Sequence, residues 1–170
     1  MKVLCVIDMQ NDFIDGALGT SEAEAIVDNV RNKIQLYREN GDMLIFTRDT
    51  HYENYMETSE GKNLPVPHCI KGSHGWQISS ALQVGDSVII DKPTFGSIEL
   101  SEHIAGLSDA QEIEFVGLCT DICVISNVLV LKAKLPEAVI SVDSSCCAGV
   151  TPESHNNALN AMKMCQIKIK

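Results

Sequence analysis

The sequence predicts an α/β fold, a three-layer doubly wound sandwich with a six-stranded, mostly parallel sheet. Short apolar runs alternate along the chain with amphipathic segments, which is the pattern of strands and helices in such a sheet. Three of these runs end abruptly in charged residues, at Asp8, Arg48 and Asp91. The chain has 170 residues, 45% of them hydrophobic, which is enough for one sizeable core. We therefore expect a single domain over residues 1–170.

The first half of the chain supplies two strands, one long helix and a long loop. Residues 3–7 are a continuous apolar run, typical of a strand buried on both faces. Ser21 and Glu24 have the spacing of a capping box, and apolar residues follow at helical intervals until Asn40 and Gly41. A second strand over 43–47 precedes residues 50–73, which keep no sustained period. A loop of that length in a compact domain is more often functional than idle.

The second half repeats the alternation. Thr151 followed by Pro152 is the start signal of the last helix, because threonine caps helices and proline suits their first position. The predicted elements are strands at 88–90, 113–118, 138–142 and 167–169, with helices from 97 to 103, from 120 to 132 and after Thr151.

Charge and cysteine content restrict the partners. The net charge is −10 and the 13 Lys and Arg residues form no basic cluster, which argues against binding to nucleic acid. Seven cysteines is an odd number, and no secretory leader precedes the first strand, so we expect a reducing, cytoplasmic location. No apolar run approaches the roughly 20 residues that cross a bilayer. Small molecules are therefore the expected partners, without a membrane.

One thiol stands out from the others by its position. Cys123 lies in the first turn of the predicted helix that directly follows the 113–118 strand. Unpaired N–H groups and the helix dipole at such a place stabilise a thiolate. Asp8 and Lys92 each follow an apolar strand, and the carboxyl ends of parallel strands open onto one edge of the sheet. A base, a cation and a thiol are thus predicted to share one cleft.

Four segments in this order resemble the isochorismatase-like cysteine hydrolases, which include nicotinamidases. They are residues 6–13 (Val-Ile-Asp-Met-Gln-Asn-Asp-Phe), residues 47–51 (Thr-Arg-Asp-Thr-His), Lys92, and residues 117–124 (Gly-Leu-Cys-Thr-Asp-Ile-Cys-Val). Together they span most of the chain. The resemblance implies a cysteine hydrolase that cleaves a C–N bond of a small amide, such as nicotinamide, through a thioester.

The resemblance also implies a role for each matching residue. Cys123 would be the nucleophile, Asp8 the base that takes its proton, and Lys92 the cation that holds the charges in place. The backbone N–H groups of Cys119 and Cys123 would form the oxyanion hole, with a cis peptide bond between Leu118 and Cys119. Small members of this family are commonly oligomers, so the resemblance also implies a homo-oligomer, either a dimer or a tetramer.

Several activities stay open within the family. Members that hydrolyse isochorismate lack the nucleophilic cysteine, so Cys123 argues against that reaction. Other amides, carbamoyl compounds and ureido acids remain alternative substrates. A further alternative is a family member that binds a metabolite without turning it over.

A metal site is implied by the nicotinamidase-like group. Asp49, His51 and His68 match three positions that hold a divalent metal such as zinc, and no organic cofactor is expected. Tyr55 stands where those enzymes place a further histidine, and tyrosine is a poor zinc ligand at neutral pH. Water could complete a three-residue site, Glu57 could substitute, or no metal binds.

The resemblance also implies one aromatic wall of the substrate pocket. Nicotinamidases hold the pyridine ring between a phenylalanine, matched here by Phe13, and a tryptophan whose position maps near Pro65. Trp76 follows later in the chain and could fold back to supply the second aromatic wall.

Overall fold

The computed structural model describes residues 1–108, 110 and 112–170, and in this part of the chain a six-stranded sheet forms the centre. The strand order is β3-β2-β1-β4-β5-β6, and every neighbouring pair is parallel. The strands are β1 (Lys2–Ile7), β2 (Met43–Asp49), β3 (Val88–Lys92), β4 (Glu112–Leu118), β5 (Val139–Ala148) and β6 (Lys168–Ile169). The predicted α/β fold class is confirmed, and the sheet is wholly rather than mostly parallel.

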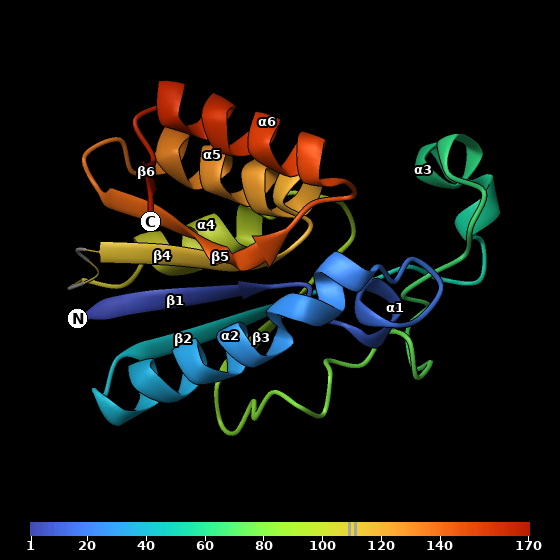
Figure 1. Cartoon of the computed structure of the whole chain (residues 1–170), viewed down its shortest axis with the longest axis horizontal. Helices are drawn as coiled ribbons and strands as arrows, with labels where there is room; N and C mark the ends of the chain where they lie inside the picture. Colours follow the sequence, from blue (N-terminus) through green and yellow to red (C-terminus); the bar gives the residue numbers. More distant parts are fainter. Residues whose placement is uncertain (109, 111) are drawn as a thin grey trace.

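Helices cover both faces of this sheet (Figure 1). One face carries α2 (Ser21–Glu39), with the short α1 (Asn11–Ile14) at its end. The other face carries α4 (Ile98–Ala105), α5 (Ile125–Lys134) and α6 (Pro152–Met164). None of the described helices combines the length and the hydropathy needed to cross a membrane.

Strand β1 explains why this chain makes two cores. Val3, Cys5 and Ile7 pack into the core beneath α4, α5 and α6. Leu4 and Val6, which point the opposite way, pack with the apolar side chains of α2. Because both faces of β1 are covered, its sequence is a continuous apolar run rather than an alternating one.

The start of α2 differs from the prediction by one residue. Thr20, not Ser21, is the N-cap: its hydroxyl oxygen accepts a hydrogen bond from the Ala23 N–H at 3.0 Å. Ser21 is the first helical residue, and its hydroxyl donates to the Glu22 carboxylate at 3.0 Å. Thr20 has the extended backbone that an N-cap requires, so the capping box predicted at Ser21 is wrong.

Two further segments follow strands β2 and β4 at the edge of the sheet where the candidate site lies. The loop after β2 contains a 3₁₀ turn, η1 (Tyr55–Glu57), and α3 (Ser59–Asn63), which stands away from the sheet in Figure 1. After β4 the chain forms a π-helical turn, η2 (Thr120–Val124), before α5 begins. Such turns occur frequently at functional sites.

Candidate active site

Four strand ends meet at one edge of the sheet. Asp8 follows β1, Asp49 ends β2 and Lys92 ends β3, while Cys119 and Cys123 follow β4. The chain runs from β1 outward to β2 and β3, then returns to β4 on the other side of β1. In open parallel sheets, ligands bind in the crevice at such a reversal of strand order. The edge where sequence reasoning placed a base, a cation and a thiol is therefore the ligand-binding edge of this topology.

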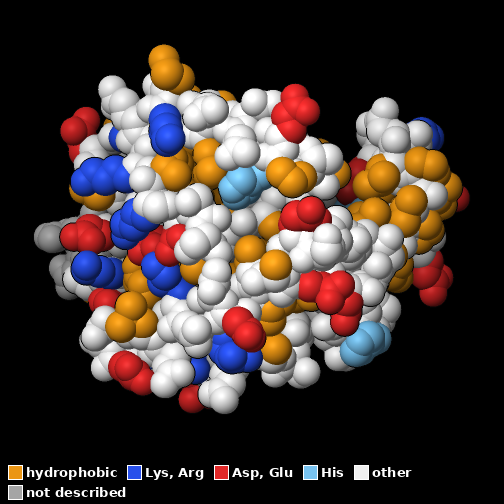
Figure 2. All heavy atoms as spheres, in the orientation of Figure 1, with side chains coloured by type: hydrophobic (Ala, Val, Ile, Leu, Met, Phe, Trp, Pro, Cys, Tyr) orange, Lys and Arg blue, Asp and Glu red, His pale blue; other side chains and the backbone are white. Residues whose placement is uncertain are grey.

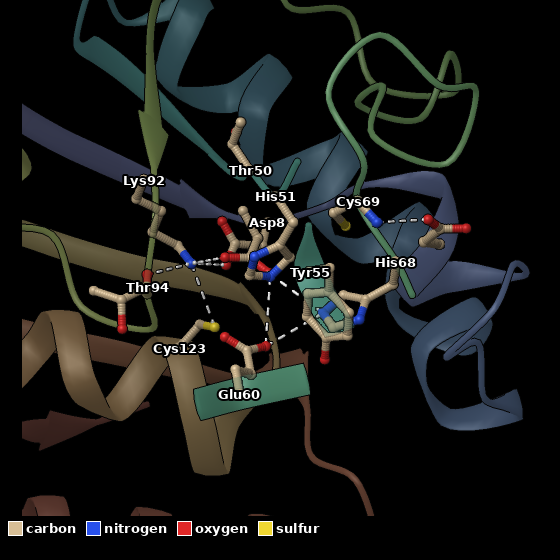
Figure 3. A network of polar contacts seen from close by, with 12 residues as sticks. Asp8, Thr50, His51, Tyr55, Glu60, His68, Cys69, Lys92, Thr94 and Cys123 are labelled. Carbon is tan, nitrogen blue, oxygen red and sulfur yellow. Dashed lines mark hydrogen bonds and ion pairs between the residues drawn. The ribbon is translucent and has the colours of Figure 1, made fainter. Parts of the chain in front are cut away.

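Lys92 is the centre of the polar network (Figure 3). Its Nζ lies 2.6 Å from Asp8 Oδ2, 3.2 Å from Asp49 Oδ1 and 3.5 Å from the sulfur of Cys123, and it donates to the Thr94 carbonyl at 3.1 Å. The side chain is completely buried. Burial opposes the charge of Lys92, but the negative charges around it raise its pKa above the usual range. Lysine is almost never buried unless it is paired, and here two carboxylates pair with it.

The surroundings of Cys123 disfavour its charged thiolate form. Burial raises the pKa of Cys123 well above its ordinary value; Lys92 works against this, and the charge of Asp8 adds to it. Burial likewise raises the pKa of Asp8, with Lys92 opposing. The stabilisation of a thiolate by the helix terminus, about 1 kcal/mol, is therefore opposed by the desolvation of the buried sulfur. Activation instead needs a neighbouring base.

Thr47 holds that base in place and was not predicted. Its hydroxyl donates to Asp8 Oδ1 at 2.6 Å and accepts from the Asp8 N–H at 3.2 Å. Asp8 has a positive φ of 46°, a conformation that non-glycine residues rarely adopt. The parallel pairing of Val6 with Phe46 brings Thr47 beside the end of β1, and this register cannot be read from single strands.

A second group of side chains gathers around Oδ2 of Asp49, the carboxylate oxygen that Lys92 does not contact. It consists of Asp49, His51, Glu60 and His68, whose ligand atoms all lie within 4.8 Å of one another. His51 Nε2 is 2.9 Å from Asp49 Oδ2, and His68 Nε2 is 3.5 Å from Glu60 Oε1. This set of imidazoles and carboxylates suits zinc and similar divalent metals.

The orientation of His68 supports metal binding. Its Nδ1 lies 2.8 Å from the carbonyl oxygen of Val66. A carbonyl can only accept, so Nδ1 carries the proton and, in the neutral ring, Nε2 turns its lone pair toward the cluster. Metal-ligating histidines commonly have this arrangement, because the second hydrogen bond fixes the tautomer.

The fourth donor comes from an unexpected residue. Glu57 is exposed in η1, whereas Glu60 on α3 reaches the two histidines. Tyr55 donates its hydroxyl to the Leu64 carbonyl at 2.8 Å and packs its ring against His51, so it forms a wall rather than a ligand. Sequence reasoning missed Glu60 because the short helix that presents it has no apolar period of its own.

A cavity of about 650 Å³ opens above the thiol. Phe13 and Phe95 both line it, and Phe95 is a second aromatic side chain that the sequence did not point to. Trp76 packs elsewhere: its Nε1 donates to Thr50 Oγ1 at 2.9 Å, and the Arg48 guanidinium lies 3.8 Å from the ring centroid. The apolar lining consists of Phe13, Leu18, Ala23, Leu64, Phe95, Leu118, Ile122 and Val150.

The turn beneath the cavity has an unusual backbone. The peptide bond between Leu118 and Cys119 is cis, and Cys119 and Cys123 both line the cavity. Gly117 precedes this turn with φ of 118°, and a Cβ there would collide with the Ile7 carbonyl oxygen of β1. Glycine is thus required where the chain leaves the sheet against β1.

Similarity to known proteins identifies the family to which this chain belongs. The isochorismatase domain model matches residues 2–169, and the chain therefore belongs to the isochorismatase family of hydrolases. Within it, an isochorismatase-family protein named PncA from Bacillus subtilis (strain 168) is 28% identical over 137 residues, 73% of this chain and 74% of that protein.

Two solved structures are similar over nearly all of both chains. The pyrazinamidase of Pyrococcus horikoshii in complex with zinc is 29% identical, with a TM-score of 0.87 over 99% of this chain and 98% of that one. The pyrazinamidase/nicotinamidase of Streptococcus mutans UA159 is 28% identical, with a TM-score of 0.88 over 100% of each chain.

Proposed function

We propose that this protein hydrolyses the C–N bond of a small uncharged amide and releases ammonia, with nicotinamide as the leading substrate. The observation that carries this proposal is the position of Lys92 Nζ, 2.6 Å from the Asp8 carboxylate and 3.5 Å from the Cys123 sulfur, beneath a largely apolar cavity. The pyrazinamidase and nicotinamidase relatives support the choice of an amide.

The first half of the reaction forms a thioester. Asp8 accepts the proton of the Cys123 thiol, and the sulfur attacks the amide carbonyl carbon. Since Lys92 lies between the two groups, it stabilises the negative charge on either of them. The N–H groups of Cys119 and Cys123 donate to the oxyanion of the tetrahedral intermediate. Asp8 then protonates the leaving nitrogen, the C–N bond breaks and ammonia departs.

The second half regenerates the thiol. Asp8 accepts a proton from water, whose oxygen attacks the thioester carbonyl. The C–S bond breaks, the carboxylic acid is released and the sulfur regains its proton from Asp8. A divalent metal held by Asp49, His51, Glu60 and His68 would supply Lewis-acid polarisation and orientation of the substrate.

The charges around the cavity favour a neutral substrate over a carbamoyl or ureido acid. Of the residues that the structure describes, none that lines the cavity is Lys or Arg. Asp8, Asp49 and Glu60 carry three negative charges, which Lys92 and a divalent ion would only balance. On the face shown in Figure 2, most Lys and Arg side chains lie away from the α3 end. A substrate carboxylate would therefore enter the cavity without a counter-ion, which is costly.

Ammonia release from a panel of matched amides tests the proposal. Nicotinamide and benzamide represent flat neutral amides, and N-carbamoylglycine represents the anionic alternative. We expect kcat/KM for the neutral amides to be higher by at least about 100-fold, because an unpaired buried charge costs several kcal/mol. If no amide released ammonia, the proposed activity would be overturned. A higher kcat/KM for the carbamoyl acid would overturn the proposed substrate class.

Metal binding gives an independent prediction. We expect the chelator-treated protein to bind one equivalent of Zn²⁺, measured by competition with a chromophoric chelator. His68→Ala is expected to weaken binding by at least about 100-fold, because it removes a direct nitrogen ligand. His74→Ala is the matched control, since His74 is exposed and lies outside the cluster. Equal affinity in both variants would refute this metal site.

A further inference from the structure

The thiol-bearing turn is tied to the last helix by a buried side chain. Thr120, the first residue of η2, lies between Cys119 and Cys123 in sequence and is completely buried. A hydrogen bond of 2.7 Å joins its hydroxyl to Nδ1 of His155, in the first turn of α6. Burial lowers the pKa of His155, so its ring is neutral at neutral pH. A buried hydroxyl needs such a partner, and here the partner lies 35 residues away in sequence.

A second contact joins the same turn to the cavity wall. Both carboxylate oxygens of Asp121 accept from the Val150 N–H, at 3.2 and 3.1 Å. Gly149 and Val150 line the cavity. A Cβ on Gly149 would come within 2.9 Å of the Cβ of His155, so the start of α6 packs directly against this wall. The turn, the wall and α6 therefore form one connected unit.

We propose that His155 is a positioning residue that holds η2 so that the N–H groups of Cys119 and Cys123 aim at the oxyanion. This inference rests on the proposed cysteine hydrolase mechanism. His155 is not among the described residues that line the cavity, so it acts through Thr120 rather than on the substrate. Catalysis is sensitive to such positioning, because a displacement of about 1 Å can cost about 100-fold in rate.

Matched substitutions separate positioning from simple packing. Asparagine can place a polar atom where Nδ1 lies, whereas leucine fills the space without one. Serine likewise retains the hydroxyl of Thr120, and valine removes it. We expect His155→Leu and Thr120→Val to lower kcat by about 10-fold or more with KM unchanged. His155→Asn and Thr120→Ser should stay close to the parent protein. Each of these two substitutions removes the same hydrogen bond. The double variant His155→Leu/Thr120→Val should therefore have a kcat no lower than that of either single variant.

An aldehyde provides a readout that does not require turnover. Pyridine-3-carbaldehyde would add to the Cys123 sulfur and form a hemithioacetal, whose oxygen occupies the place of the oxyanion. We expect its affinity to fall in His155→Leu by the same factor as kcat, while the thermal midpoint of His155→Asn matches that of the parent.

The outcomes distinguish this inference from the proposed function. An unchanged kcat in His155→Leu, or a loss in His155→Asn as large as in His155→Leu, overturns the positioning role and leaves the thiol mechanism standing. If the parent protein releases no ammonia from any amide, the proposed function fails, and the aldehyde affinities alone decide the role of His155. If the parent protein neither releases ammonia nor binds the aldehyde, both proposals fail. If it releases ammonia but does not bind the aldehyde, the kcat values of the variants decide the role of His155.

Discussion

Cys123→Ala is expected to lower ammonia release from the best amide by at least about 10⁴-fold, because it removes the protein atom that forms a covalent bond to the acyl carbon in the proposed mechanism. Cys123→Ser should be nearly as inactive, since Asp8 would have to deprotonate a hydroxyl that is far less acidic than a thiol. Both variants should still bind the amide, because the cavity walls are intact. Steady-state ammonia release and equilibrium binding together check these expectations.

The matched control for this loss is Cys165→Ala. Cys165 is an exposed free cysteine that follows α6. Its replacement should leave kcat and KM unchanged, which separates the effect of one thiol from a general effect of losing a cysteine. Cys123→Ala activity within tenfold of the parent protein would show that the nucleophile lies elsewhere.

Lys92→Met should damage both stability and activity. The substitution keeps much of the side-chain volume but leaves the buried carboxylate of Asp8 without its cation and removes one of the positive partners of Asp49. Removing one partner of a buried ion pair costs about 3–5 kcal/mol of unfolding free energy. Asp8 would also gain a proton more readily, because Lys92 works against its raised pKa, and a protonated Asp8 is no base. Urea unfolding and ammonia release measure the two losses.

Lys71→Met is the control for that experiment. The side chain of Lys71 is half exposed, and its Nζ lies 3.8 Å from Asp91 Oδ2. Exposed pairs of this kind contribute about 0–1 kcal/mol, so this variant should unfold almost as the parent does. If Lys92→Met were equally stable and active, Lys92 would have no part in compensating the buried carboxylates.

The sheet and its functional edge could be predicted because each depends on local pattern. A strand covered on both faces must be apolar throughout, as β1 is, and the charged residue that ends it must then sit at the sheet edge. Asp8 could be recognised for this reason, and Lys92 could be recognised because it also follows a short apolar run, residues 88–90. Cys123 could be recognised as a candidate nucleophile because β4 runs almost directly into a helix.

The residues that support the site owe their positions to contacts between segments far apart in the sequence, and a local sequence pattern does not reveal such contacts. Thr47 bonds to Asp8 through the register of β1 with β2, and Glu60 reaches His51 only because the loop after β2 brings α3 near the residues that follow this strand. His155 shows no partner in the sequence, yet in the structure it holds Thr120. The raised pKa of Cys123 could not be predicted for a related reason, since desolvation depends on the whole surrounding core.

The most direct test of the central claim is mass spectrometry of the protein quenched in acid during turnover of its best amide. A thioester predicts the added mass of the acyl group on the peptide that contains Cys123, and none on that of Cys123→Ala. An acyl group on any other residue, or steady ammonia release with Cys123 unmodified throughout, would contradict the cysteine mechanism.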